Sequence, residues 1–210
     1  MVQVYAHGLG QTPASWDKVF SLMNDSAKIV CPDLSDIVRG EDVCYASLYN
    51  AFNYICSNIS EPIDLCGLSL GGVIALNYAI EHPDKVNSLV LIAAQYKMPK
   101  ALLRIQNIMF RLMPKSGFQG LGFGKADFIS LCDSMIRLDF SGSLDKVACP
   151  VLVAYGERDD ANKKASVKLA GLLKNAELRV VSNSGHQVNL DAPEEAAAML
   201  SDFFEKNSIR

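Results

Sequence analysis

The sequence predicts an α/β fold built on a mostly parallel, doubly wound sheet, and three observations lead to this prediction. Six short apolar runs have the length and composition of buried strands. The segments between them are long enough for crossover helices, which would cover both faces of the sheet. Half of the 210 residues are hydrophobic, enough to bury the core of one domain. A single domain spanning residues 1–210 is therefore expected.

The first elements follow from their local patterns. The six strands are expected at residues 2–6, 28–31, 63–66, 86–94, 150–156 and 177–182. Thr12 and Pro13 supply an N-cap and a first-turn proline after the first strand. Apolar side chains then recur at helical spacing, at Trp16, Phe20 and Met23. A helix is expected to begin there.

Two further helices are predicted from their apolar periodicity. One begins at Tyr45 and presents a stripe formed by Tyr45, Leu48, Phe52, Ile55 and Ile59. The other begins near Pro193, with Glu194 and Glu195 beside the positive end of its dipole. Its inward-facing residues are expected to be Ala196, Met199, Leu200, Phe203 and Phe204.

One segment breaks the alternation of strands and helices. More than fifty residues separate the fourth and fifth strands, from Gln95 to Ala148, far more than an ordinary connection in this fold class. We expect a small helical lid at about residues 96–140. Pro99 and Pro114 should bracket a helix of about fourteen residues within it.

The predicted lid helix is amphipathic and basic. Its polar stripe consists of Lys100, Arg104, Asn107 and Arg111, and residues 95–125 hold six cations and no carboxylate. These cations could favour an ester or enol-lactone that carries a carboxylate, or could touch anionic lipid. The simplest interpretation is a solvated polar face on a helix that packs by its apolar side.

Composition excludes several classes of protein. The net charge of −3 argues against nucleic-acid binding. The chain lacks an apolar run of about 18 residues and begins without the pattern of a signal peptide, so a cytoplasmic location without membrane contact is expected. The six cysteines form no C-x-x-C pair, which favours buried free thiols over disulfides or zinc. Neither a metal nor a cofactor is expected.

Ser69 stands in the sequence Gly67-Leu68-Ser69-Leu70-Gly71, between a predicted strand and a predicted helix. A turn this sharp needs small residues on either side of its centre, because larger side chains would collide with neighbouring elements. Its central side chain is presented at the carboxyl end of the sheet, where ligands bind in this fold class. The spacing therefore predicts a nucleophilic serine.

A serine nucleophile needs a base, and the base needs an acid that orients it. His186 follows the last predicted strand and can reach Ser69, whereas His82 is expected to face solvent at a helix end. Asp159 lies three residues after Gly156, beyond the fifth strand, and is preferred as the acid. Its neighbour Asp160, together with Asn162, is expected to cap the next helix.

The chain resembles the α/β-hydrolase superfamily. The resemblance rests on "HGLG", "CPDL", "CGLSLGG", "HPDKVNSLVLI", "CPVLVAYGERD" and "SNSGHQ", which occur in that order along nearly the whole chain. It implies that Ser69 is the nucleophile, Asp159 the acid and His186 the base. It also implies an oxyanion hole formed by the backbone N–H groups of Leu9 and Leu70.

The sequence departs from the family pattern in three places. Family members commonly begin with two more strands, so the strand at 28–31 is expected at a sheet edge, where a homodimer could form. Serine at position 69 disfavours the dehalogenases and epoxide hydrolases that use aspartate. Gln95 and Tyr96 stand where some relatives carry the acid. His7 is expected to hold its loop by hydrogen bonds.

The favoured function is a small carboxylesterase whose partner is a small-molecule ester or lactone. The elbow also resembles that of enol-lactonases, and carbon–carbon bond hydrolases of ring-cleavage products share the triad, so both stay open as alternatives. A ligand-sensing receptor with a hydrolase fold is a further alternative, because some family members keep the triad and act as sensors.

Overall fold

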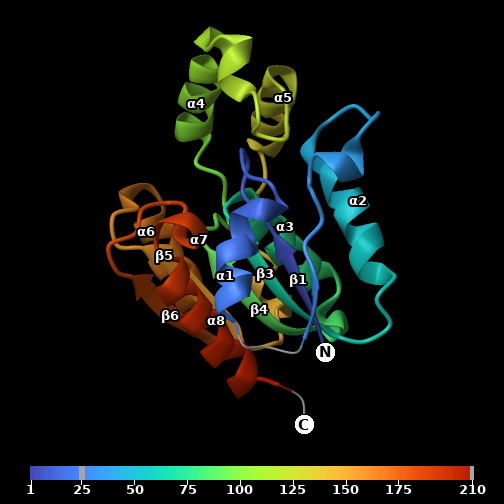
Figure 1. Cartoon of the computed structure of the whole chain (residues 1–210), viewed down its shortest axis with the longest axis vertical. Helices are drawn as coiled ribbons and strands as arrows, with labels where there is room; N and C mark the ends of the chain where they lie inside the picture. The colour runs from blue at the N-terminus through green and yellow to red at the C-terminus, as the bar shows by residue number, and fades with distance from the viewer. Residues whose placement is uncertain (24–26, 209–210) are drawn as a thin grey trace.

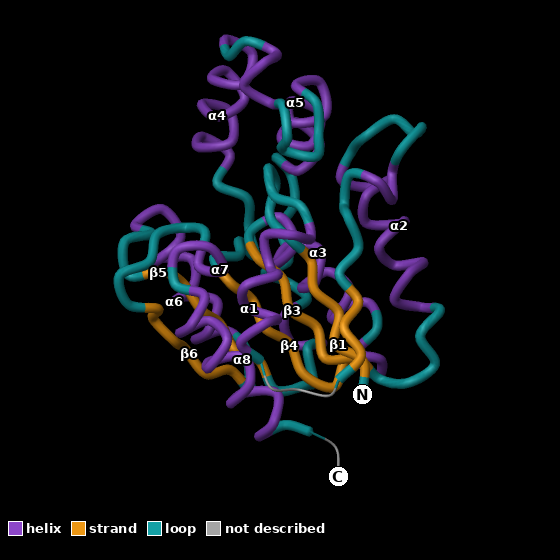
Figure 2. Tube along the Cα trace, viewed as in Figure 1, coloured by secondary structure: helices purple, strands orange, loops and turns teal. Residues whose placement is uncertain are grey.

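The protein is built on one parallel sheet of six strands in the order β2-β1-β3-β4-β5-β6 (Figures 1 and 2). The computed structural model describes residues 1–23 and 27–208. The strands are β1 (Val2–Ala6), β2 (Lys28–Val30), β3 (Ile63–Leu68), β4 (Val86–Ile92), β5 (Val151–Gly156) and β6 (Ala176–Val181). All six predicted strands are confirmed to within two residues at each end, and with them the α/β fold class.

Helices connect the strands, and several short turns are 3₁₀. The α-helices are α1 (Asp17–Leu22), α2 (Tyr45–Ser57), α3 (Leu70–Glu81), α4 (Lys100–Leu112), α5 (Lys125–Met135), α6 (Asp160–Leu172), α7 (Val188–Asp191) and α8 (Pro193–Lys206). The 3₁₀ turns are η1 (Pro13–Trp16), η2 (Asp36–Val38), η3 (Pro83–Lys85), η4 (Lys115–Phe118) and η5 (Leu144–Lys146). In the described residues, no helix is both long enough and apolar enough to cross a bilayer.

Strand alternation divides the core into two layers, one on each face of the sheet. Val4 and Leu65 point into the layer covered by α2, α3 and α6, while Tyr5 and Cys66 point into the layer covered by α1 and α8. Figure 1 shows α1 and α8 together over one face of the sheet. Val4 of β1 pairs with Val30 of β2 on one side and with Leu65 of β3 on the other. Among the described residues, β2 has no further strand beyond it in the sheet order and lies at the edge, as predicted.

The helix predictions need four corrections. The first helix begins at Pro13 as a 3₁₀ turn and becomes α-helical only at Asp17. The helix from Tyr45 ends at Ser57, so Ile59, the last residue of the predicted stripe, lies past its C-terminus. Its buried face runs through Cys56 rather than Ile55. The predicted face of α8 holds, except that Met199 is only partly buried.

The six cysteines are free, as predicted, but they are not all buried. Cys31 and Cys44 are half-buried, and Cys44 caps the start of α2. Burial raises the pKa of Cys56 to about 12 and that of Cys132 to about 11. The buried thiols are therefore protonated at neutral pH.

Helices α4 and α5 stand together beyond the carboxyl end of the sheet (Figure 1). The chain enters and leaves this segment side by side, since Phe140 N donates to Tyr96 O and Met98 N donates to Leu138 O. The expectation that α4 packs by its apolar side holds only in part, because Leu103 and Phe110 pack against the core while other apolar residues of the helix are exposed. Asn107 is the buried residue of α4, while Ile108 and Leu112 face solvent. Asn107 makes polar contacts with α5, described below.

Gly71 is required by the close approach of β1 to α3. A Cβ atom at Gly71 would lie 2.0 Å from the carbonyl oxygen of Ala6, a backbone atom that cannot move alone. We expect Gly71→Ala to lower the free energy of unfolding by about 3 kcal/mol or to prevent folding. Gly171→Ala is the matched control in α6, since its Cβ meets nothing within 4 Å. That control should gain about 0.5–1 kcal/mol in urea denaturation, and an equal effect of both variants would contradict this account.

Candidate active site

Three side chains from separate loops meet at the carboxyl end of the sheet. His186 Nε2 lies 3.0 Å from Ser69 Oγ, and His186 Nδ1 lies 2.8 Å from Asp159 Oδ2. The loops follow β3, β5 and β6, whose carboxyl ends share one edge because the strands are parallel. The structure thus brings together the three residues singled out in the sequence, in an unbroken chain from carboxylate to imidazole to hydroxyl.

Ser69 occupies a strained turn between β3 and α3. Its φ is 54° and its ψ is −113°, a conformation that residues other than glycine rarely adopt. The turn is held because Ser69 N donates to Ile92 O at 2.8 Å, and Val73 N donates to Ser69 O at 3.0 Å. These bonds fix the side chain at the N-terminus of α3, in the lining of a cavity.

Asp159, not Asp160, faces the histidine. Asp159 is only 6% exposed, whereas Asp160 is exposed as the first residue of α6. The expected capping by Asp160 and Asn162 is wrong, because Asp159 is itself the N-cap and accepts from Asn162 N. Burial alone would raise the pKa of the Asp159 carboxyl, but hydrogen bonds from His186 and Asn162 outweigh it and lower the pKa. The carboxylate is ionised at neutral pH.

Two amide side chains near the carboxylate were not predicted as part of the site. Asn162 Nδ2 lies 2.9 Å from both carboxylate oxygens of Asp159 and 3.1 Å from His186 Nδ1. Gln95 Nε2 donates to Asn162 Oδ1 at 2.7 Å. In the sequence, Gln95 stands out only because some relatives carry the catalytic acid at that position. Asn162 stands out only as a residue expected to cap a helix.

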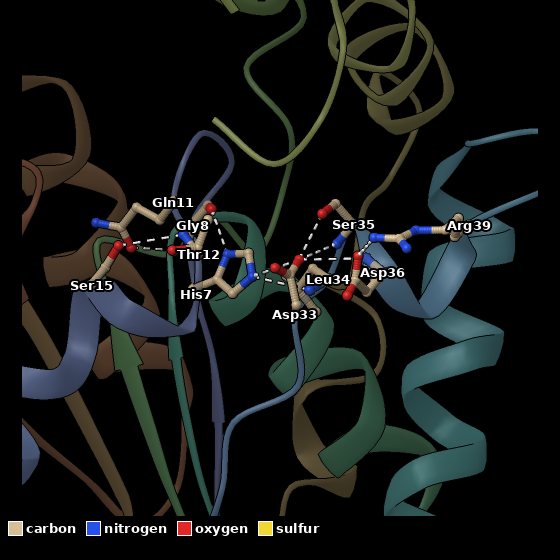
Figure 3. A network of polar contacts seen from close by, with 10 residues as sticks. All are labelled: His7, Gly8, Gln11, Thr12, Ser15, Asp33, Leu34, Ser35, Asp36 and Arg39. Atoms are coloured by element: carbon tan, nitrogen blue, oxygen red, sulfur yellow. Dashed lines mark hydrogen bonds and ion pairs between the residues drawn. The ribbon is translucent and has the colours of Figure 1, made fainter. Parts of the chain in front are cut away.

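His7 is buried and holds two loops together (Figure 3). Its Nδ1 donates to Gly8 O at 2.9 Å, and its Nε2 accepts from Leu34 N at 3.0 Å. Because a backbone N–H can only donate, the Nε2 atom must be unprotonated and the ring neutral. These bonds agree with the predicted role of His7 in holding its loop.

His82 lies at the other end of α3 from Ser69, about 20 Å away along the helix axis. The expectation that it faces solvent is wrong, because it is half-buried and its ring centroid lies 4.6 Å from that of Tyr78. Neither His7 nor His82 contacts Ser69 through any hydrogen bond among the described residues.

His7 gives the protein an acid sensitivity that can be tested. Burial lowers the pKa of His7 below its ordinary value of 6.5, despite opposing effects of Gly8 O and Asp33. The unfolded chain therefore takes up this proton first, and the stability present above pH 6.5 is lost as the pH falls through the folded-state pKa. We expect the free energy of unfolding to fall more steeply below that pH in the wild type than in His7→Gln. Parallel curves from urea denaturation at several pH values would contradict this.

The two residues predicted to supply the oxyanion hole, Leu9 and Leu70, both line the cavity. Leu70 is the first residue of α3, where an N–H has no partner within its helix. Leu9 follows the His7 loop, and both leucines line the cavity beside Ser69. Neither N–H donates to a backbone or side-chain acceptor within the described residues. The oxyanion hole at Leu9 and Leu70 stays a prediction.

The cavity at Ser69 has a volume of about 370 Å³ and a mostly apolar lining. Its polar lining residues are uncharged or belong to the site, namely Ser69, Gln95, Gln106, Asn162 and His186. The apolar lining comes from α4 and α5, including Leu103, Met109 and Met135, and from the sheet edge. No lysine or arginine of the described residues lines it, so the basic side chains of α4 lie outside the cavity.

The comparisons with known proteins agree with this fold. The model of the alpha/beta hydrolase family matches residues 3–199, so the chain belongs to the α/β-hydrolase family. Pimeloyl-[acyl-carrier protein] methyl ester esterase from Neisseria meningitidis is 26% identical over 242 residues, covering 95% of this chain and 91% of the relative. Monoacylglycerol lipase abhd6-B from Xenopus laevis is 22% identical over 251 residues, covering 94% and 73%.

Solved structures show the same fold at lower identity. The enol-lactonase from Burkholderia xenovorans superposes with a TM-score of 0.82 at 16% identity, covering 97% of this chain and 91% of that chain. A thermophilic esterase from Thermogutta terrifontis superposes with a TM-score of 0.81 at 18% identity, covering 100% and 91%. The family resemblance expected from the sequence is confirmed, and the chain is a hydrolase of this family.

Proposed function

We propose that the protein is a serine esterase that cleaves a small carboxylic ester with an uncharged, apolar acyl group. The observation that carries this proposal is the chain of hydrogen bonds from Asp159 through His186 to Ser69, in the lining of an apolar cavity. The esterase named among the relatives supports the same reaction class. No cofactor is needed for this chemistry.

The geometry supports a two-step acyl transfer. His186 Nε2 takes the Ser69 proton as Oγ attacks the ester carbonyl, and His186 then delivers the proton to the departing alcohol. Asp159 holds Nδ1 protonated and stabilises the charged ring. Water repeats the sequence on the acyl-enzyme, and the N–H groups of Leu9 and Leu70 hold the oxyanion in both steps.

The segment around α4 and α5 serves as a lid in this proposal. It supplies one wall of the cavity, through residues of α4 such as Leu103 and Met109 and of α5 such as Met135. An acyl group held there is kept from water while the carbonyl faces Ser69. An enol-lactone that carries a carboxylate is less well accommodated, since no cation faces the cavity.

A fluorophosphonate probe and a substrate panel test the proposal. The probe should label wild-type protein at Ser69 and leave Ser69→Ala unlabelled. p-Nitrophenyl esters of unbranched acids should turn over faster than esters carrying a second carboxylate, enol-lactones or vinylogous diketones. Turnover of the diketones alone would favour a carbon–carbon bond hydrolase. Strong thermal stabilisation by a ligand that is never cleaved, without ester turnover, would favour a receptor.

A further inference from the structure

The outer face of α4 exposes five large apolar side chains to solvent. Their exposed fractions are Leu102 47%, Ile105 58%, Ile108 58%, Met109 58% and Leu112 81%. They fall on one side of the helix because successive residues turn by about 100°. A contiguous apolar surface of this kind on a folded protein marks a place where something binds.

Polar contacts with α5 hold this face outward. Asn107 donates to Asp133 and to Ile129 O. It lies on the same side of α4 as Leu103 and Phe110, which pack against the core. Arg111 pairs with Asp133 at 3.1 Å, and Lys125 Nζ donates to the carbonyl oxygens of Arg111 and Met113 at 2.7 and 2.6 Å. Turning the apolar face inward would break these bonds.

Two cations flank the apolar face. Lys100 and Arg104 lie on the same side of α4 as Ile108, at the border of the apolar stripe. They form no ion pair with a described residue, and residues 95–125 contain no carboxylate. The exposed stripe itself, at 101, 102, 105, 108, 109 and 112, is entirely aliphatic or methionine.

The same face is continuous with the cavity at Ser69. Leu102, Ile105 and Met109 are exposed on α4 and also line the cavity. An acyl chain lying against the face could therefore pass to Ser69 without crossing a polar surface.

We propose that the α4 face docks onto an anionic lipid surface. Aliphatic side chains bordered by lysine and arginine satisfy such a surface, which needs apolar area and positive charge but no specific hydrogen bonds. A protein partner is less suited, because the stripe has no aromatic or hydrogen-bonding side chain to serve as an anchor. A second copy would bring like charges together.

Vesicle flotation tests the docking directly. Wild-type protein should float with vesicles of phosphatidylcholine mixed with phosphatidylglycerol, and bind pure phosphatidylcholine vesicles more weakly. Ile108→Ser with Leu112→Ser, two residues outside the cavity lining, should weaken binding to the mixed vesicles more than about tenfold. Lys100→Gln with Arg104→Gln should weaken it about fivefold for each cation, and only on anionic vesicles.

Matched variants on α6 serve as controls. Leu172→Ser removes an exposed apolar side chain, and Lys163→Gln with Lys164→Gln removes two exposed cations; these should bind vesicles as the wild type does. Unchanged binding by the α4 variants, or no wild-type binding to anionic vesicles, would overturn the proposal. If the protein does not bind vesicles, two other results would also overturn the proposal. One is binding to an acidic acyl carrier protein, and the other is a dimer that is lost in Ile108→Ser with Leu112→Ser.

The docking is independent of the proposed function. Ser69→Ala should float with anionic vesicles as the wild type does, and the α4 variants should hydrolyse a soluble p-nitrophenyl ester at the wild-type rate. An active enzyme that ignores vesicles refutes only the docking. A vesicle-bound protein without esterase activity refutes only the proposed function.

A second observation points to a positioning residue. We infer that Asn162 holds the Asp159 carboxylate in the orientation that His186 needs, an inference that rests on the proposed function. Gln95 occupies Asn162 Oδ1, so the Asn162 NH₂ group must face Asp159. Since His186 Nδ1–H also donates to Asp159, the Asn162 and His186 donors converge on one carboxylate.

Kinetics and proton NMR test the role of Asn162. Asn162→Ala should lower kcat about tenfold to a hundredfold and change KM less than about threefold. It should also shift or broaden the far-downfield resonance of the His186 Nδ1 proton. Gln95→Leu should act in the same direction, and Lys163→Ala on the same helix should do neither. If both amide variants keep kcat and the resonance while Ser69→Ala is inactive, the inference fails and the proposed function stands.

Discussion

Ser69→Ala should lower kcat for p-nitrophenyl esters by about 10⁶. The loss is this large because, in the proposed mechanism, the hydroxyl supplies both the attacking atom and the site of the acyl-enzyme. His186 Nε2, 3.0 Å from Oγ in the wild type, would have no proton to accept. Steady-state assays with the purified variant measure the effect.

The folded state of Ser69→Ala is the necessary control. Alanine and serine have similar preferences at a positive φ, so the strained turn should persist and the melting temperature should change little. Residual turnover above about a tenth of the wild-type value in a folded variant would refute Ser69 as the nucleophile.

Asp159→Asn should lower kcat by about 10⁴. The asparagine keeps the size of the side chain, but it no longer requires a proton on His186 Nδ1, so the imidazole takes the wrong tautomer for accepting from Ser69. Asp159 is not among the residues that line the cavity, so KM should change much less than kcat.

Asp160 provides an unusually close control for this experiment. It is the next residue along the chain, carries the same charge and is exposed at the start of α6. Asp160→Asn should keep kcat within about twofold and cost about 0.3–1 kcal/mol of stability through the helix dipole. Equal losses in both variants would mean that the acid has been misassigned.

The sequence was sufficient to predict the strands and the meeting of Ser69, Asp159 and His186. The strands are short apolar runs, and the carboxyl ends of parallel strands necessarily share an edge. The turn after β5 also distinguished the two aspartates, because Asp159 N donates to Gly156 O at 2.8 Å and turns the next side chain outward.

The orientation of α4 could not be predicted from its own residues. Its apolar periodicity is strong, and periodicity alone places such a face against the core. The contacts on its packing side come from Asp133 and Ile129, more than twenty residues beyond Asn107, and from the ring of Phe128 against Phe110. The role of Asn162 could not be predicted for a related reason. Capping preferences indicate where a helix begins, but they do not show that His186, from the loop after β6, lies beside that helix start.

The distribution of Ser69, Asp159 and His186 along the chain matters while the protein is being made. A nascent chain can close the turn between β3 and α3 early, but Asp159 and His186 leave the ribosome only after β5 and β6 have been synthesised. Ester cleavage by chains that are still being translated would then report the docking of the last two strands, in real time and without an added label.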